Sequence, residues 1–436
     1  MTRRPRSKSV VKSGAAVAAT VPARVPDYYE KFQCIGPDCE DSCCIGWRVD
    51  IDRDTWQRYQ ACRHETLAPL IRSVVIPVAE KNHRSARNYA NVTMRADGCC
   101  PFLQPDRLCM VQKELGAEAL STTCAVFPRS HSRFGEYREY GLDLSCPEAA
   151  RLILLHPEPI RLVAASADAD LGARDVLLYN LVGDPKHIAI LDDFRSLILG
   201  ILQFRELTLG ARMMMLGLLL DEVARVVRSP LYKSSADIVP VLSSFNGLFS
   251  DPAACEAQFA QIPADTPRKL HAITTFLADF LKNGRPRFVE CVLACVDGLL
   301  GSDKPEGGKD SGGAALARYE HAYDAYYATY FRGKEYILEN YLVNEVLTKL
   351  FPFMSVRGSY LDQYRTLALN LAIIQMFLVG IAGHYKGLTD ERVIQLIQSF
   401  ARRSAHDTSY IGKLTEATRS QGGHTMADEM WMLKDR

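Results

Sequence analysis

The run Phe32-Gln-Cys34-Ile-Gly-Pro-Asp-Cys39-Glu-Asp-Ser-Cys43-Cys44 places four thiols within a short stretch near the start of the chain. Most of the other cysteines follow soon after it: Cys62, Cys99, Cys100, Cys109, Cys124 and Cys146 precede residue 150, and only Cys255, Cys291 and Cys295 come later. Thiols this dense need a shared structural reason. The segment is therefore organised either by a disulfide framework or by a bound metal.

Size and composition argue against the disulfide framework. Disulfide scaffolds are short secreted domains, whereas this chain has 436 residues, of which 47% are hydrophobic. Residues 1–26 contain a weak Ala/Val stretch without a clean cleavage site, which is not typical of a secretory signal. We therefore expect a cytoplasmic protein, in which thiols stay reduced and clustered cysteines more often hold metal.

Charge and hydropathy exclude other broad classes of protein. The net charge is +1, from 52 basic and 51 acidic residues, so no overall field favours nucleic acid. The most apolar segment, 367–383, is interrupted by Asn370 and Gln375 and is short for a membrane span. We expect a buried helix there, no membrane insertion and no nucleic-acid partner.

The pattern of residues predicts a mainly α protein, in which a small cysteine-rich, metal-organised domain precedes a large α-helical domain. The expected parts are a disordered basic tail at 1–26, the cysteine-rich domain at 27–156, and the helical domain at 157–436 with a flexible Gly-rich loop at 301–313. Alternating polar and apolar residues predict short strands at 47–51 and 136–144. Pro147 and Glu148 mark the start of a helix.

The cysteine spacing indicates a metal without identifying it. Structural zinc sites commonly use paired C-x2-C knuckles, and the spacing here is C-x4-C-x3-C-C followed by C-C-x8-C. Iron–sulfur clusters are normally held by four cysteines and tolerate irregular spacing. The residues alone leave an iron–sulfur cluster, zinc, and redox-active or merely buried thiols open.

The motifs of the chain resemble two related protein families. The cysteine pattern, with Cys100-Pro-Phe-Leu, Cys109 and Cys124-x2-Phe127-Pro128, is similar to the CxxCxxCC family of zinc- or iron-chelating proteins. Further motifs resemble the flagellin lysine-N-methylases, the FliB family: Gly46-Trp47, Asp50-Ile51-Asp52, Leu120-Ser121-x-Thr123-Cys124, Phe127-Pro128-Arg129, Leu144-Ser145-Cys146-Pro147-Glu148-Ala149-Ala150, Ile337-Leu-Glu-Asn340-Tyr341-Leu-Val-Asn344 and Gln398-Ser-Phe. The resemblance covers most of the chain after residue 27.

The FliB resemblance implies an enzyme of the bacterial flagellum. Such an enzyme is an S-adenosylmethionine-dependent protein-lysine N-methyltransferase, with flagellin as its partner and a 4Fe–4S cluster as its cofactor. The metal candidates carried over by position are Cys34, Cys39, Cys43, Cys44, Cys100, Cys109, Cys124 and Cys146. A single cluster needs at most four ligands, and the proximity of Cys39, Cys43 and Cys44 makes them the first choices.

The candidates for catalysis and donor binding are less specific. His131 and His406 are possible general bases for a lysine ammonium. Arg129 is a possible contact for the carboxylate of S-adenosylmethionine. The family has Glu-His-Asn where this chain has Ala405, His406 and Asp407, which puts any role of that glutamate in doubt.

Two rival functions keep the cysteines and lose the methyl donor. The first is a non-catalytic zinc- or iron-chelating module whose helices bind a partner. The second is an iron–sulfur electron-transfer protein. No Gly-x-Gly-x-Gly motif follows a predicted strand, so the common Rossmann-type methyltransferase fold is not supported.

Overall fold

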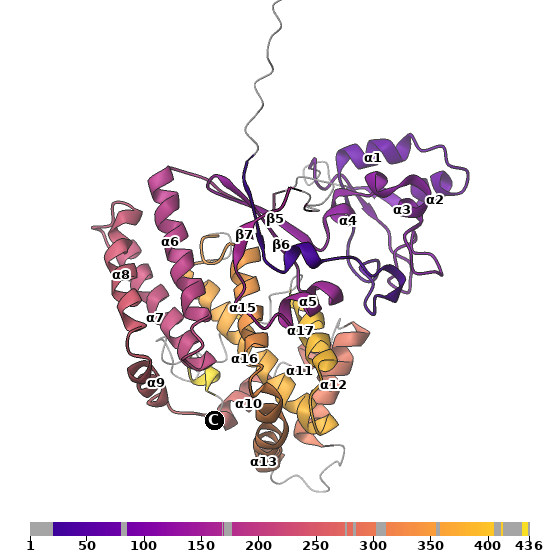
Figure 1. The fold of residues 1–436 in the computed structure, drawn as a ribbon. Coiled ribbons are helices and arrows are strands. Elements are labelled where there is room, and N and C mark those ends of the chain that lie inside the picture. The colour runs from indigo at the N-terminus through magenta and orange to yellow at the C-terminus, as the bar shows by residue number, and fades with distance from the viewer. Residues whose placement is uncertain are drawn as a thin grey trace, which may run out of the picture.

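The computed structural model describes residues 21–79, 85–167, 169, 177–274, 277–281, 285–301, 311–354, 358–404, 411–412 and 430–434. The described part of the chain is mainly α, which confirms the predicted fold class, and its small sheets lie in the N-terminal part (Figure 1). The expected tail extended to residue 26, but residues 23–26 form a strand, and residues 1–20 lie outside the described residues.

Two small sheets organise the N-terminal part. The five-stranded sheet has the order β7-β1-β6-β5-β8 and the three-stranded sheet has the order β2-β4-β3. The strands are β1 (Ala23–Pro26), β2 (Asp50–Ile51), β3 (Val75–Pro77), β4 (Ala90–Val92), β5 (Arg129–Phe134), β6 (Tyr137–Leu142), β7 (Leu162–Ala164) and β8 (Tyr179–Leu181). The predicted strand at 136–144 is confirmed as β6, whereas only two residues of the predicted strand at 47–51 pair, as β2.

Short helices surround the cysteines and longer helices build the body. The short helices are α1 (Arg53–Gln60), α2 (Leu67–Val74), α3 (Met110–Leu115), α4 (Thr122–Val126) and α5 (Pro147–Leu154). The body contains α6 (Pro185–Leu202), α7 (Leu209–Arg228), α8 (Val239–Leu248), α9 (Pro252–Ala260), α10 (Thr266–Thr274), α11 (Leu277–Leu281), α12 (Pro286–Leu300), α13 (Ser311–Ala322), α14 (Ala328–Phe331), α15 (Tyr336–Thr348), α16 (Tyr360–Tyr385) and α17 (Asp390–Ser404). Residues 302–310 of the predicted Gly-rich loop lie outside the described residues, and 311–313 belong to α13.

The main apolar core crosses the predicted domain boundary at residue 157. Val25 and Leu142 from the five-stranded sheet are fully buried in the same core as the long helices. A second core, which includes Val49, Ile51 and Val111, lies entirely within the cysteine-rich part. The five-stranded sheet therefore belongs with the helical body, and the short helices α1–α4 form a separate lobe beside it (Figure 1).

Helix α16 is the central helix of the body. It is long and apolar enough to cross a membrane, but 89% of its most apolar window is buried inside the protein, which confirms the predicted core helix at 367–383. Helix α12 approaches it closely because glycines face each other: a Cβ on Gly298 would overlap the carbonyl oxygen of Gly380. Helices α12 and α17 also pack together and lie beneath the cysteine-rich lobe (Figure 1).

Candidate functional site

All eight cysteines predicted as metal candidates line one cavity, which we name the thiol cavity. Its volume is about 190 Å³. The thiols come from the loop at 34–44, the segment after β4, the start of α3, the interior of α4 and the start of α5: Cys34, Cys39, Cys43, Cys44, Cys100, Cys109, Cys124 and Cys146. Each of the 13 cysteines is described and each is a free thiol. The structure thus brings together residues that are spread over more than a hundred positions of the sequence.

Caps and turns fix the walls of the thiol cavity. Asp52 caps α1 by accepting from the Thr55 amide at 2.8 Å and also accepts from the Thr122 amide at 2.9 Å, which ties α1 to α4. Burial alone would raise the pKa of Asp52, but these hydrogen bonds outweigh it and hold the pKa at about 2. Ser121 caps α4 by accepting from the Cys124 amide at 3.3 Å. Two of the FliB-like motifs therefore position α4 and its thiol.

Cys43 is the thiol in the cavity whose pKa is lowered, and its charge affects the pKa of its neighbours. A hydrogen bond from the Cys44 thiol and the nearby Arg402 guanidinium lower the pKa of Cys43, whereas the same hydrogen bond and burial raise the pKa of Cys44. Burial raises the pKa of Cys100 to about 11 and that of Cys124 to about 12, and the Cys43 charge contributes to both shifts. The thiolate form, which binds metals, is thus favoured first at Cys43.

The eight thiols line a cavity of about 190 Å³. Among the described residues, no three His, Cys, Asp or Glu side chains form a set that could hold a single metal ion. A tetrahedral zinc with bonds of about 2.3 Å requires sulfur atoms almost in contact. A polynuclear cluster, by contrast, binds each thiolate through a different iron, so its ligands surround a larger volume. The soft sulfur donors and their arrangement fit such a cluster.

A second cavity, which we name the arginine cavity, adjoins the first. Its volume is about 670 Å³. Its lining comes from the cysteine-rich lobe and from the helices beneath it: Asp41, Gly46, Trp47, Arg48, Asp50, Thr123, Arg285, Arg287, Phe288, Ser399, Arg402 and Arg403. Asp41 and Trp47 line both cavities and therefore form part of the wall between them.

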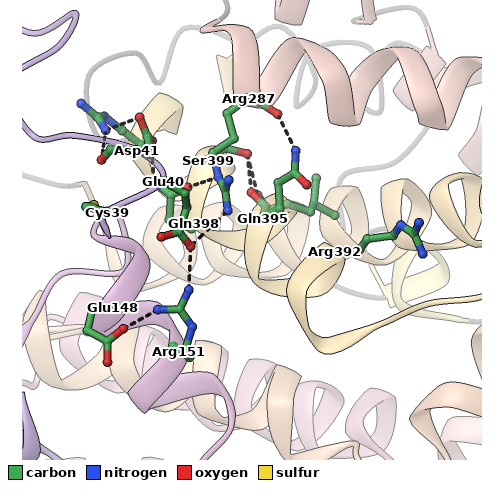
Figure 2. Close-up of polar contacts among 12 residues, drawn as sticks. Cys39, Glu40, Asp41, Glu148, Arg151, Arg287, Arg392, Gln395, Gln398 and Ser399 are labelled. Carbon is green, nitrogen blue, oxygen red and sulfur yellow. Dashed lines mark hydrogen bonds and ion pairs between the residues drawn. The ribbon is translucent and has the colours of Figure 1, made fainter. Parts of the chain in front are cut away.

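Helix α17 holds the cysteine loop through the motif Gln398-Ser-Phe. The Gln398 amide nitrogen donates to Asp41 Oδ2 at 2.8 Å and to the Ser145 carbonyl at 2.7 Å, while its oxygen accepts from Arg287 Nε at 3.0 Å. Figure 2 shows Gln398 at the centre of this network, which also includes the ion pair of Arg151 with Glu40. Gln398 is fully buried. Removing it would leave several buried polar groups unsatisfied.

Two arginines extend this support to the carbonyl groups of the loop. Arg402 pairs with Asp41 at 2.7 Å and donates to the Ser42 and Ile45 carbonyls at 3.0 and 2.7 Å. Arg285 donates to the Ile45 carbonyl at 2.6 Å and to the carbonyl of Gly46. Burial and the neighbouring Arg402 lower the pKa of Arg285 to about 10. The two guanidinium groups thus hold the loop in shape; Arg402 is paired with Asp41, whereas Arg285 donates to backbone carbonyls.

Gly46 allows this close approach. Its φ is +69°, and a Cβ there would lie 3.2 Å from the Arg285 guanidinium carbon. The next residue, Trp47, packs against Phe127 with ring centroids 5.3 Å apart and donates from its indole to the Cys43 carbonyl. The FliB-like motif Gly46-Trp47 therefore links the two cavities.

Of the remaining predicted residues, one lines the thiol cavity, one lies elsewhere, and one lies outside the described residues. Arg129 lines the thiol cavity with its guanidinium 5.3 Å from the centre of the Phe32 ring. His131 lies in β5, is 2% exposed, and packs edge-on against Tyr140 at 4.6 Å. It lines neither of the two cavities. His406, with Ala405 and Asp407, lies outside the described residues. The roles of these residues stay predictions.

No sequence motif predicted the arginine cavity. Arg402 and Arg403 follow the motif Gln398-Ser-Phe after one alanine, and this was the one available signal. Arg285 and Arg287 belong to no motif, and only the packing of α12 against α17 brings them to the loop. Cys99 lies next to Cys100 in the chain but is not part of the cavity lining.

The fold and the two cavities define a mainly helical protein with a thiol-lined centre held by a C-terminal helix. Residues 195–432 match the family described as the FliB lysine N-methylase C-terminal domain. Because this match covers more than half of the chain, the protein belongs to that family.

Individual relatives match a shorter part. The chain is 36% identical over 138 residues to the lysine-N-methylase of Salmonella typhimurium (strain LT2), which is 31% of this chain and 33% of that protein. The chain is also 36% identical over 138 residues to the flagellar biosynthetic protein FliU of Salmonella muenchen, and this match covers 79% of FliU. The matched segment thus spans about a third of the length of the lysine-N-methylase. No solved structure matches the chain.

Proposed function

We propose that this protein is a protein-lysine N-methyltransferase that transfers the methyl group of S-adenosylmethionine to surface lysines of flagellin. The observation that carries the proposal is the thiol cavity, in which the eight candidate cysteines meet. Membership of the FliB lysine N-methylase family and the names of the relatives, which include a lysine-N-methylase and a flagellar biosynthetic protein, support the reaction and the flagellar substrate. A cytoplasmic location is part of the same proposal.

The thiol cavity is proposed to hold a 4Fe–4S cluster. Its donors are soft thiolates in surplus, and its volume of about 190 Å³ lies between them. We place the ligands, at most four, within the group formed by Cys43 and the thiols whose pKa its charge raises: Cys39, Cys43, Cys44, Cys100, Cys109 and Cys124. When bound, a cluster with three cysteine ligands would leave one iron open to a small ligand.

The chain's own groups have three tasks in the reaction. Gln398 and Arg402 keep the cysteine loop in place. Trp47 forms part of the wall between the two cavities. The substrate lysine must lose a proton before its nitrogen can attack, and Asp50 is the lining carboxylate suited to accept it, because Asp41 is engaged by Arg402 and Gln398. His131 is less suited to that task because it lies buried against Tyr140.

The rival functions predict different contents of the same cavity. A zinc-stapled binding module would contain zinc, be colourless and transfer no methyl group. An electron-transfer protein would contain iron and sulfide but would not bind S-adenosylmethionine. Neither rival accounts for an adjoining cavity of about 670 Å³ that is rich in arginine.

The test is a transfer assay with the full chain purified without oxygen. Flagellin is incubated with S-adenosylmethionine that carries an isotope-labelled methyl group, and lysine peptides are analysed by mass spectrometry. Labelled methyl groups on flagellin lysines that depend on the protein are the expected result. Labelled flagellin must be absent when the protein is left out. Unlabelled flagellin with metal-loaded, donor-saturated protein would overturn the proposal.

A further inference from the structure

The arginine cavity carries a surplus of positive charge. Five arginines line it against two aspartates. Three of these arginines have acidic partners: Arg48 pairs with Asp50 at 2.7 Å, Arg402 pairs with Asp41 at 2.7 Å, and Arg287 lies 3.7 Å from Glu40. Arg285 is half-buried and, among the described residues, gives its hydrogen bonds to backbone carbonyls. A bound anion would offset this charge.

The shape of the cavity suits a small molecule with an aromatic part. Its volume of about 670 Å³ lies within the range of small-molecule sites. Trp47 and Phe288 contribute aromatic surface to its wall, and Trp47 also faces the thiol cavity. A ligand bound here would therefore lie next to the thiols. Its anionic end would face the arginines of α12 and α17.

We propose that the arginine cavity binds the methyl donor, with the carboxylate of its methionine part held by Arg287 and Arg403 in place of Arg129, which lines the thiol cavity, and with its adenine placed against Trp47. This inference rests on the proposed function, because it takes S-adenosylmethionine as the donor. Arg287 comes from α12 and Arg403 from α17, so the carboxylate would bridge the two helices that support the cysteine loop. Planar guanidinium groups are suited to hold a carboxylate through paired hydrogen bonds.

The experiment compares two ligands that differ in the methionine part. S-adenosylhomocysteine keeps the carboxylate, whereas 5′-methylthioadenosine keeps the adenosine and sulfur but lacks it. Affinities of both are measured by calorimetry with the full chain purified without oxygen. The variants are Arg287→Gln and Arg403→Gln. The matched control is Arg392→Gln on the same helix α17, where Arg392 lies over the Tyr385 ring at 3.8 Å, away from the network of Gln398 (Figure 2).

The unaltered protein is expected to prefer S-adenosylhomocysteine. In Arg287→Gln and Arg403→Gln, the affinity for that ligand falls about 10- to 100-fold, as for a lost charge-assisted hydrogen bond, and the affinity for methylthioadenosine stays the same. The Arg392→Gln control behaves as the unaltered protein does. Melting temperatures are compared in parallel, and Arg403→Gln carries the test if Arg287→Gln does not fold.

Three results would overturn the inference, and they are distinguishable. Equal affinity of the unaltered protein for both ligands means that no carboxylate contact exists. Unchanged affinities in both arginine variants, together with a raised KM for flagellin, mean that the cavity holds an acidic group of flagellin instead. Failure of the unaltered protein to bind either ligand removes the donor itself and with it the proposed function.

Discussion

The side-chain amide of Gln398 lies 2.8 Å from the carboxylate of Asp41, although the two residues are 357 positions apart in the sequence. Asp41 lies between Cys39 and Cys43, so this hydrogen bond joins the C-terminal helix α17 directly to the cysteine loop. The family motif that contains Gln398 is thereby explained as a support for the thiol centre. Loss of this support should lower the metal content of the protein more than its stability.

The variant Gln398→Ala tests the support. It removes three hydrogen bonds and leaves Asp41 and Arg287 with unsatisfied groups, so we expect a loss of stability of about 1–3 kcal/mol. The larger effect is on metal content, because the loop that presents Cys39 and Cys43 is released. Iron and sulfide per chain are measured after reconstitution. Gln395→Ala, one turn earlier and bonded to Glu290, is the control and should keep its metal. Full metal content in Gln398→Ala would show that α17 does not support the site.

Cys99 and Cys100 form a matched pair for the thiol cavity. Cys100 is 6% exposed and lines the cavity, whereas its neighbour Cys99 does not contribute to the lining. We expect Cys100→Ser to lose most of its bound metal and Cys99→Ser to keep it, since serine oxygen is a poor replacement for a soft thiolate. Metal analysis and the visible absorbance of both variants provide the measurement. Equal retention in the two would show that Cys100 is not a ligand of the metal.

Asp52 predicts a loss of stability at low pH. Its folded pKa of about 2 lies below the ordinary value of 3.8, so its contribution is complete above about pH 4 and disappears as the pH falls towards 2. Because Asp52 is only partly buried, we expect about 1–2 kcal/mol after allowance for solvent screening. Urea unfolding of the protein and of Asp52→Asn should differ at pH 6 and converge near pH 2. A constant difference over this range would contradict the assignment.

Gly298 predicts a clash between the two central helices. A methyl group at this position would overlap the Gly380 carbonyl and approach the His384 amide at 2.8 Å. We expect Gly298→Ala to lower the free energy of unfolding by about 1–3 kcal/mol, as overpacking usually does. Gly247→Ala in α8 is the control, because no atom lies within 4 Å of its added methyl group, and its higher helix propensity favours folding. Thermal unfolding measures the stability of both variants. A Gly298→Ala protein as stable as the Gly247→Ala control would disprove the close contact between α12 and α16.

The sequence predicted the parts that depend on local pattern. The apolar pattern identified the core helix at 367–383, Pro147 and Glu148 identified the start of α5, and the clustered thiols identified the residues that line one cavity. The extent of the five-stranded sheet was missed because β7 and β8 have three residues each and are held by distant partners, such as Val163 opposite Val25. Three-residue strands carry too little alternation to be recognised from sequence.

The arginine cavity could not be predicted for a related reason. Arg285 reaches the Ile45 carbonyl across 240 positions, and Arg402 reaches Asp41 across 361. Nothing local distinguishes such an arginine from one on a solvated helix face. Only the tertiary packing of α12 and α17 against the cysteine-rich lobe brings these groups together.

The most direct test of the central claim, that the thiol cavity holds an iron–sulfur cluster, is metal analysis of the full chain purified without oxygen. We predict a brown protein with a broad absorbance in the blue, and about four iron and four sulfide per chain. The Cys100→Ser variant, purified in the same way, should be nearly colourless. A colourless protein with one equivalent of zinc would contradict the claim and identify the cysteine-rich lobe as a zinc-stapled binding module.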